Sequence, residues 1–257
     1  MTPRVEQPTI LLTFAGVTVI TVVAKSLASY DPSVVWSRFT PVATVTWLWL
    51  VLFLERLRRA HAADARAALS QATWVTLARG FLIALVAGFV PGPVPAGGAR
   101  WLPGVLYTLA ALADGADGAL ARRTAGVTAL GARLDVTTDA LGLLLAPLVG
   151  VRWGRLPPWY LALALAYPAF GLALRLRRAR GRAVFAERLK PDPRARFFAG
   201  VQMTVVAAAL FPLLPRALTW TMATVAMLPT LALFAGEWQL VTRSAADGDA
   251  RAERLHP

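Results

Sequence analysis

Four aspartates lie at the ends of two strongly apolar segments: Asp114, Asp117, Asp135 and Asp139. An ionised carboxylate in such a segment is costly unless a cation or a metal ion neutralises it, so these four are candidates for function. Carboxylate oxygens are ligands that suit Mg²⁺ or Mn²⁺, and two such ions can neutralise a diphosphate and help a leaving group depart. The carboxylate least committed to metal could take a proton from an attacking hydroxyl. The residue types therefore indicate metal-assisted phosphate chemistry.

The spacing of these aspartates predicts two carboxylate-bearing helix faces. Residues three, four, seven or eight positions apart share one face of a helix. A short connection makes consecutive helices antiparallel neighbours, so two carboxylates from each helix can converge near one membrane surface. The first face holds Asp114, Asp117, Gly118, Ala121 and Arg122, and the second holds Gly131, Asp135 and Asp139.

The elements that carry these residues are expected to be membrane-spanning helices. The chain has 257 residues, of which 57% are hydrophobic, and its mean hydropathy is +0.55. Such values are too apolar for an ordinary soluble domain and predict an all-α integral membrane protein. We expect a bundle of about eight transmembrane helices, at residues 8–26, 34–54, 72–91, 100–120, 134–151, 157–175, 197–214 and 217–241.

The charge of the chain is strongly basic, with 27 Lys and Arg against 14 Asp and Glu. A basic chain can bind nucleic acid, but in so apolar a sequence it favours basic cytoplasmic loops between spans. Alternating the loops places 20 basic residues on the side of the N-terminus and six on the other. We therefore predict no nucleic-acid partner, and a multi-pass protein of the cell (inner) membrane with both termini and the active site on the cytoplasmic side.

Other kinds of site are excluded or disfavoured by composition. There is no cysteine, so disulfides and thiolate metal sites are excluded. The two histidines, His61 and His256, lie outside the apolar segments, which argues against a histidine metal site. The first apolar run lacks a convincing cleavage site, and we expect it to be a retained helix.

Written out, the acidic stretch is D-x2-D-G-x2-A-R-x8-G-x3-D-x3-D, from Asp114 to Asp139. This pattern resembles in full the motif of the CDP-alcohol phosphatidyltransferase family. The resemblance implies a six-helix core with the motif on its second and third helices, and a homodimer. On that basis we expect an N-terminal two-helix extension at residues 1–66, the core at 67–242 and a polar cytoplasmic tail at 243–257.

The resemblance also implies a role for each motif residue. The four aspartates would hold two ions, Mg²⁺ or Mn²⁺, and Asp139 would also deprotonate the acceptor alcohol. Relatives often carry Pro-Asn-x-x-Thr-x-x-Arg at the start of the core, and here Ala72 and Thr73 replace the Pro-Asn pair. The residues expected around the CDP moiety are Gly118, Ala121, Arg122, Thr128, Gly131, Thr76 and Arg79.

The implied reaction is attack by an alcohol on the β-phosphate of a CDP-linked donor, usually CDP-diacylglycerol, with release of CMP. The acceptor is left open, because Ala140 stands where relatives that make phosphatidylglycerol phosphate or phosphatidylinositol phosphate commonly have a basic residue. A phosphorylated polyol such as glycerol 3-phosphate, or an inositol compound, is the expected class. Side chains that suit an acceptor phosphate are Arg133, Lys190, Arg194 and Arg196.

Three alternatives stay open at this point. The donor could be a soluble CDP-alcohol with a lipid acceptor. A divalent-cation transporter would use the acids as its ion site, but would place them near the bilayer midplane in matched halves. A silent scaffold would keep the fold without turnover, and simple salt bridges to Arg122, Arg123 and Arg133 would leave the acids without chemistry.

Overall fold

The computed structural model describes residues 7–60, 71–121, 129–181 and 193–253, and within these ranges the chain forms helices and turns without any strand. The long helices are joined by short helical turns at residues 32–39, 97–101 and 158–160. In chain order the elements are α1 (Gln7–Ala28), α2 (Pro32–Val34), η1 (Val35–Phe39), α3 (Thr40–Ala60), α4 (Gln71–Gly88), η4 (Gly97–Trp101), α5 (Leu102–Ala121), α6 (Ala129–Arg152), η5 (Pro158–Tyr160), α7 (Leu161–Ala179), α8 (Pro193–Leu210) and α9 (Arg216–Glu253).

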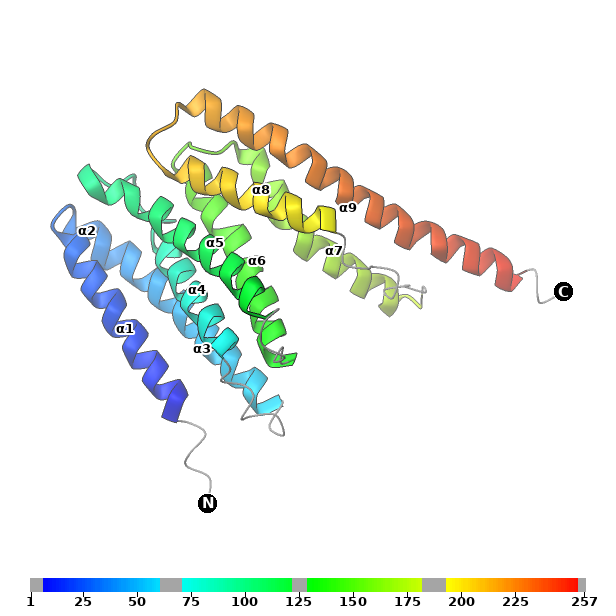
Figure 1. Cartoon of the computed structure of the whole chain (residues 1–257), viewed down its shortest axis with the longest axis horizontal. Helices are drawn as coiled ribbons and strands as arrows, with labels where there is room; N and C mark the ends of the chain where they lie inside the picture. Colours follow the sequence, from blue (N-terminus) through cyan, green and yellow to red (C-terminus); the bar gives the residue numbers. More distant parts are fainter. Residues whose placement is uncertain (1–6, 61–70, 122–128, 182–192, 254–257) are drawn as a thin grey trace, which may run out of the picture.

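Helix α4 occupies the centre of the bundle. It packs against α3 on one side and against α5 and α6 on the other. Helices α1 and α3 pair at one edge, whereas α7, α8 and α9 form the opposite edge (Figure 1). The central position follows from composition, because α4 buries residues all round, among them Leu77, Ile83 and Val86.

The contact between α3 and α4 depends on Gly80. A methyl group at position 80 would overlap the side chain of Leu50, which is itself fully buried, and would lie 3.7 Å from Thr138 Cγ2 on α6. Glycine therefore lets α4 lie close to both neighbours. The residue before it is Arg79, so this close packing also fixes where Arg79 stands.

The pairing of α1 with α3 is built on Trp47. Its indole Nε1 donates to the carbonyl of Leu12 at 3.2 Å, and its ring covers Gly16, where a methyl group would overlap it. Near the start of α1, Thr9 donates to Glu55 Oε2 at 2.7 Å. These contacts join the first half of α1 to the part of α3 between Trp47 and Glu55 through side chain and backbone.

The end of the bundle where α6 gives way to α7 is held by Arg155. Its Nε donates to the carbonyl of Ala209 at 3.0 Å, and its Nη2 donates to the carbonyls of Phe211 and Leu214 at 2.7 and 2.8 Å. The preceding Gly154 has a φ of +67°, which allows the chain to turn there. This arginine thereby binds the carbonyls exposed where α8 ends.

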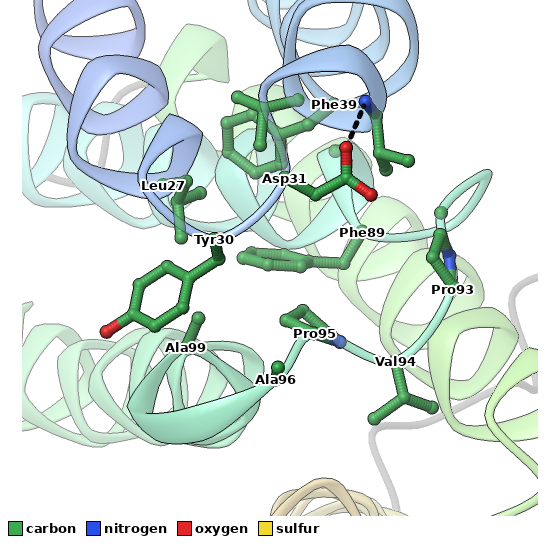
Figure 2. Close-up of a pocket in the computed structure, with 14 residues that line it drawn as sticks. Leu27, Tyr30, Asp31, Phe39, Phe89, Pro93, Val94, Pro95, Ala96 and Ala99 are labelled. Carbon is green, nitrogen blue, oxygen red and sulfur yellow. Dashed lines mark hydrogen bonds between the residues drawn. The ribbon is translucent and has the colours of Figure 1, made fainter.

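A cavity of about 190 Å³ lies at the end of α4 that follows Gly88. Its walls are mainly apolar and include Leu27, Phe39 and Phe89, with Asp31 at its margin (Figure 2). None of the residues predicted to act on substrate lines it. The cavity is therefore separate from the aspartates of the motif.

The helices support the predicted class of protein but not the predicted number of spans. Within the described residues, five segments are long and apolar enough to cross a membrane, and a sixth qualifies if Pro158–Ala166 and Ala169–Ala179, bent by 43°, form one span. The spans predicted at 100–120 and 197–214 fall on α5 and α8, which are not among them. The described side chains of α5 end at Gly115 and those of α8 begin at Arg194, so neither helix offers a described stretch of the required length, and the count of eight stays a prediction. The five segments are Thr9–Ala28, Pro32–Ala60, Gln71–Gly88, Leu130–Arg152 and Arg216–Gln239.

Candidate active site

Three of the four motif aspartates converge in the structure, as their spacing predicts. Asp114 comes from α5, and Asp135 and Asp139 come from successive turns of α6. One carboxylate oxygen from each lies within 4.8 Å of the others. We call these three side chains the acid cluster. The side chain of Asp117 belongs to the part of α5 whose side chains the structure does not describe.

A buried arginine from α4 stands in the middle of the acid cluster. Arg79 Nη1 pairs with Asp114 Oδ1, and Nη2 pairs with Asp135 Oδ1 at 2.7 Å and Asp139 Oδ1 at 2.8 Å. Nη2 also donates to the backbone carbonyl of Asp135 at 3.3 Å. Arg79 was predicted to contact the CDP moiety; in the structure its partners are the predicted metal ligands.

Burial differs sharply between the arginine and its partners. The side chain of Arg79 is 3% exposed, whereas those of Asp114, Asp135 and Asp139 are 35%, 39% and 35% exposed. The guanidinium thus lies on the inner side of the cluster, and the carboxylates face an accessible space. The exposed fractions of the three carboxylates leave the cluster accessible to a ligand.

The cluster has the composition of a site for a hard divalent cation. Its ligands are carboxylate oxygens from three side chains, and each of the arginine pairs engages a single oxygen. Three carboxylates and one guanidinium leave a formal charge of −2, since −3 + 1 = −2. Mg²⁺ and Mn²⁺ prefer such donors, so the residues present fit the predicted ions.

The structure assigns the remaining predicted nucleotide contacts only in part. Thr76 lies one turn before Arg79, is buried, and donates to the carbonyl of Ala72 at 3.0 Å. Gly131 lies one turn before Asp135 on α6 and is half-buried. Arg122 and Thr128 lie outside the described residues, as do the side-chain positions of Gly118 and Ala121 on α5.

The structure describes no interaction between the acid cluster and the side chains predicted to bind the acceptor. Arg133 is exposed on α6, two residues before Asp135. Arg194 and Arg196 are exposed in the first turn of α8. Lys190 lies outside the described residues. These side chains stay predicted contacts.

A tyrosine near the acid cluster was not singled out from the sequence. Tyr107 on α5 is 3% exposed, and its hydroxyl is buried with no hydrogen-bond partner among the described residues. The charges of Asp139 and Asp114 act on it. Its position seven residues before Asp114 places it on the same helix face, which is the signal that could have found it.

Comparisons with known proteins give one informative result. Neither a curated protein nor a solved structure matches the chain. The family model for CDP-alcohol phosphatidyltransferase matches residues 69–233, which span α4 to α8 and most of the apolar part of α9. This match covers well over half of the chain and includes Arg79 and the whole acid cluster. The chain therefore belongs to the CDP-alcohol phosphatidyltransferase family, and is a membrane transferase of substituted phosphate groups that acts in phospholipid synthesis.

Proposed function

We propose that the protein transfers a phosphatidyl group from CDP-diacylglycerol to an alcohol, with a divalent metal bound at the acid cluster and CMP as the product. The observation that carries this proposal is the convergence of carboxylates from α5 and α6 within 4.8 Å of one another. Family membership supplies the CDP-alcohol donor, the alcohol acceptor and the membrane.

Asp114, Asp135 and Asp139 would hold the metal, together with Asp117. The formal charge of −2 on the described cluster is matched by one divalent ion, and a second ion would call on Asp117. When bound, Mg²⁺ or Mn²⁺ supplies positive charge to the diphosphate and to the departing CMP. This fit supports a metal requirement for the reaction.

Asp139 is the proposed base. It sits on the second turn of α6 after Gly131, where one of its oxygens pairs with Arg79 and its side chain remains about one-third exposed. Its carboxylate accepts the proton of the acceptor hydroxyl as that oxygen bonds to the β-phosphorus of the donor. The bond between this phosphorus and the oxygen bridging to the α-phosphate breaks, and CMP leaves with that oxygen.

The nucleotide is proposed to lie along α4 and the α5–α6 connection. Thr76 lies one turn before Arg79 on α4, and Gly131 lies one turn before Asp135 on α6. Gly118, Ala121, Arg122 and Thr128 complete the proposed contacts, with Arg122 on the diphosphate. For an acceptor phosphate we propose Arg133, Lys190, Arg194 and Arg196, which favours a phosphorylated polyol such as glycerol 3-phosphate or an inositol phosphate.

The test is CMP release by the protein purified in detergent. The donor is CDP-diacylglycerol, and the acceptors are glycerol 3-phosphate, inositol 1-phosphate, inositol, serine and water, each with Mg²⁺, with Mn²⁺ and with EDTA. We expect acceptor-dependent CMP that needs metal and is lost in Asp139→Asn. The matched control is Asp31→Asn, which changes an exposed aspartate at the margin of the cavity near Gly88.

The outcomes separate the remaining candidates. CMP release with one acceptor names the alcohol. Release from CDP-choline or CDP-ethanolamine with diacylglycerol, but not from CDP-diacylglycerol, would replace the proposed donor by a soluble CDP-alcohol. Turnover by the parent protein in EDTA would refute the metal requirement, and turnover by Asp139→Asn would refute the proposed base. The proposed homodimer is checked by the mass of the protein in detergent.

A further inference from the structure

Arg79 is a cation placed among the proposed metal ligands, and this position calls for an explanation. A residue that serves only to contact a nucleotide would present its guanidinium to the accessible space. Here the Arg79 side chain is 3% exposed, whereas the side chains of its aspartate partners are 35–39% exposed. Both of its terminal nitrogens are committed to aspartates, and its Nε is buried with no partner among the described residues.

We propose that Arg79 is a positioning residue for the metal site: it binds one oxygen of each carboxylate, holds the three in register, and lowers the affinity of the cluster for the divalent ion. The proposal rests on the metal site proposed above. In this role Arg79 contacts the aspartates that would bind the metal, and it does not contact the nucleotide.

The geometry favours arginine for this task. The guanidinium has a rigid fork of donors, and the two nitrogens at its tip reach Asp114 of α5 and Asp135 and Asp139 of α6 at the same time. Without that charge, three carboxylates within 4.8 Å of one another repel, because like charges at such short range disfavour each other even when they are partly exposed. Arg79 therefore ties together two helices whose acids would otherwise push apart.

The N-terminal helices contribute to this arrangement through Gly80. Leu50 of α3 packs directly against Gly80, and Thr138, the neighbour of Asp139, lies against the same residue from α6. Both Leu50 and Thr138 are buried. The backbone that carries Arg79 is thus held between α3 and the helix that carries two of its partners.

Removing the charge of Arg79 should change stability and metal binding in opposite senses. With Arg79→Gln, the carboxylates repel in EDTA, and we expect the melting temperature to fall by about 10 °C. Saturating Mn²⁺ supplies the missing charge and should restore most of that loss. A ligand that stabilises the variant more than the parent binds the variant more tightly, so we expect the Kd for Mn²⁺ to fall by about tenfold.

The experiment measures Mn²⁺ binding by the EPR signal of the free ion, and thermal unfolding in EDTA and in Mn²⁺, on the purified full chain without substrate. The matched control is Arg155→Gln, which removes an arginine whose three partners are neutral carbonyls. That variant should melt lower by the same amount in EDTA and in Mn²⁺, with an unchanged Kd. Arg79→Lys keeps the charge without the fork, and should keep the parental Kd while melting lower in EDTA.

Two results would overturn the proposal. One is a Kd for Mn²⁺ in Arg79→Gln that is unchanged or weaker. The other is a fall in melting temperature that Mn²⁺ does not reverse. If Arg79→Gln does not fold in EDTA, purification in Mn²⁺ followed by stepwise removal of the metal gives the same comparison. Because no donor is present, failure here leaves the CMP-release assay unaffected, whereas absence of Mn²⁺ binding by the parent protein would refute the metal site itself.

Discussion

Arg79 and Arg155 each bind three residues from distant parts of the chain, but the groups that they bind differ in charge. Arg79 pairs with the three carboxylates of the acid cluster and also donates to the carbonyl of Asp135, whereas Arg155 binds, among the described residues, only the backbone carbonyls of residues 209, 211 and 214. Burial lowers the pKa of the Arg155 guanidinium, and no acid is among the groups that act on it. At Arg155, within the described part of the chain, a single cation therefore donates hydrogen bonds to neutral carbonyl groups only.

The difference explains why only one of the two places suits a ligand. Around Arg155 the three carbonyls need no further charge once they accept hydrogen bonds. Around Arg79 the formal charge remains −2, and the carboxylates are about one-third exposed. A site for a cation therefore follows from the charge left over and its access to solvent, more than from the presence of a buried arginine.

The largest effect is expected on CMP release when one of the carboxylates around Arg79 loses its charge. Asp135→Asn keeps an oxygen for Arg79 but removes a metal ligand and one negative charge. We expect CMP release to fall by about 10³-fold, with a raised Mn²⁺ requirement. Rates at several Mn²⁺ concentrations measure this. Activity per folded molecule equal to that of the parent would mean that Asp135 is only a partner of Arg79.

The next effect concerns the packing that positions Arg79. Leu50→Ala removes a fully buried side chain from the contact with Gly80, and we expect a loss of about 3 kcal/mol in stability. Leu52→Ala, on the same helix with its side chain 62% exposed, is the control and should change stability little. Unfolding in detergent and denaturant compares the two. Equal losses would show that the α3–α4 contact does not support the site.

A smaller effect is expected at the other arginine. Arg155→Gln loses hydrogen bonds to up to three carbonyls, which we expect to cost about 2 kcal/mol. CMP release per folded molecule should stay at the parental rate, because no residue of the acid cluster contacts Arg155. A specific loss of turnover in this variant would break the contrast between the two arginines.

The smallest effect is expected at Asp31, which accepts a hydrogen bond from the backbone N–H of Val34 at 3.2 Å (Figure 2). That bond, with one from Ser33, holds the pKa of the exposed carboxyl below its ordinary value. The stabilisation is therefore present above the ordinary pKa and is lost as the pH falls through the lowered one. The melting temperatures of the parent and Asp31→Asn should differ slightly at neutral pH and coincide in acid; a difference that persists in acid would show that these hydrogen bonds to the ionised carboxylate are not its cause.

The sequence predicted those parts of the site that local spacing determines. Four-residue spacing on α6 correctly placed Asp135 and Asp139 on one face, and the short connection to α5 predicted that Asp114 would meet them. The class of fold also followed from composition. Spacing within a helix carries no information on which residue of a third helix will enter the cluster, so the partners of Arg79 were not predicted.

What the sequence did not predict has physical reasons as well. The count of eight spans stays a prediction, because α5 and α8 are described over stretches too short to qualify as spans. The contact of Leu50 with Gly80 depends on how closely two helices approach, which composition does not show. Tyr107 looked like an ordinary core residue, because its nearness to the aspartates arises only after the helices pack.

The pairing of α1 with α3 through Trp47 also bears on how the protein is made. Each of these helices contacts the next long one in the chain, α1 with α3 and α3 with α4. During synthesis the N-terminal parts of a chain are available first. All residues of the α1–α3 hairpin, closed by the indole over Gly16, are therefore synthesised before α4, and we expect this pair to form first. Its surface at Leu50 gives α4 and its buried arginine a protein neighbour on arrival, in place of lipid.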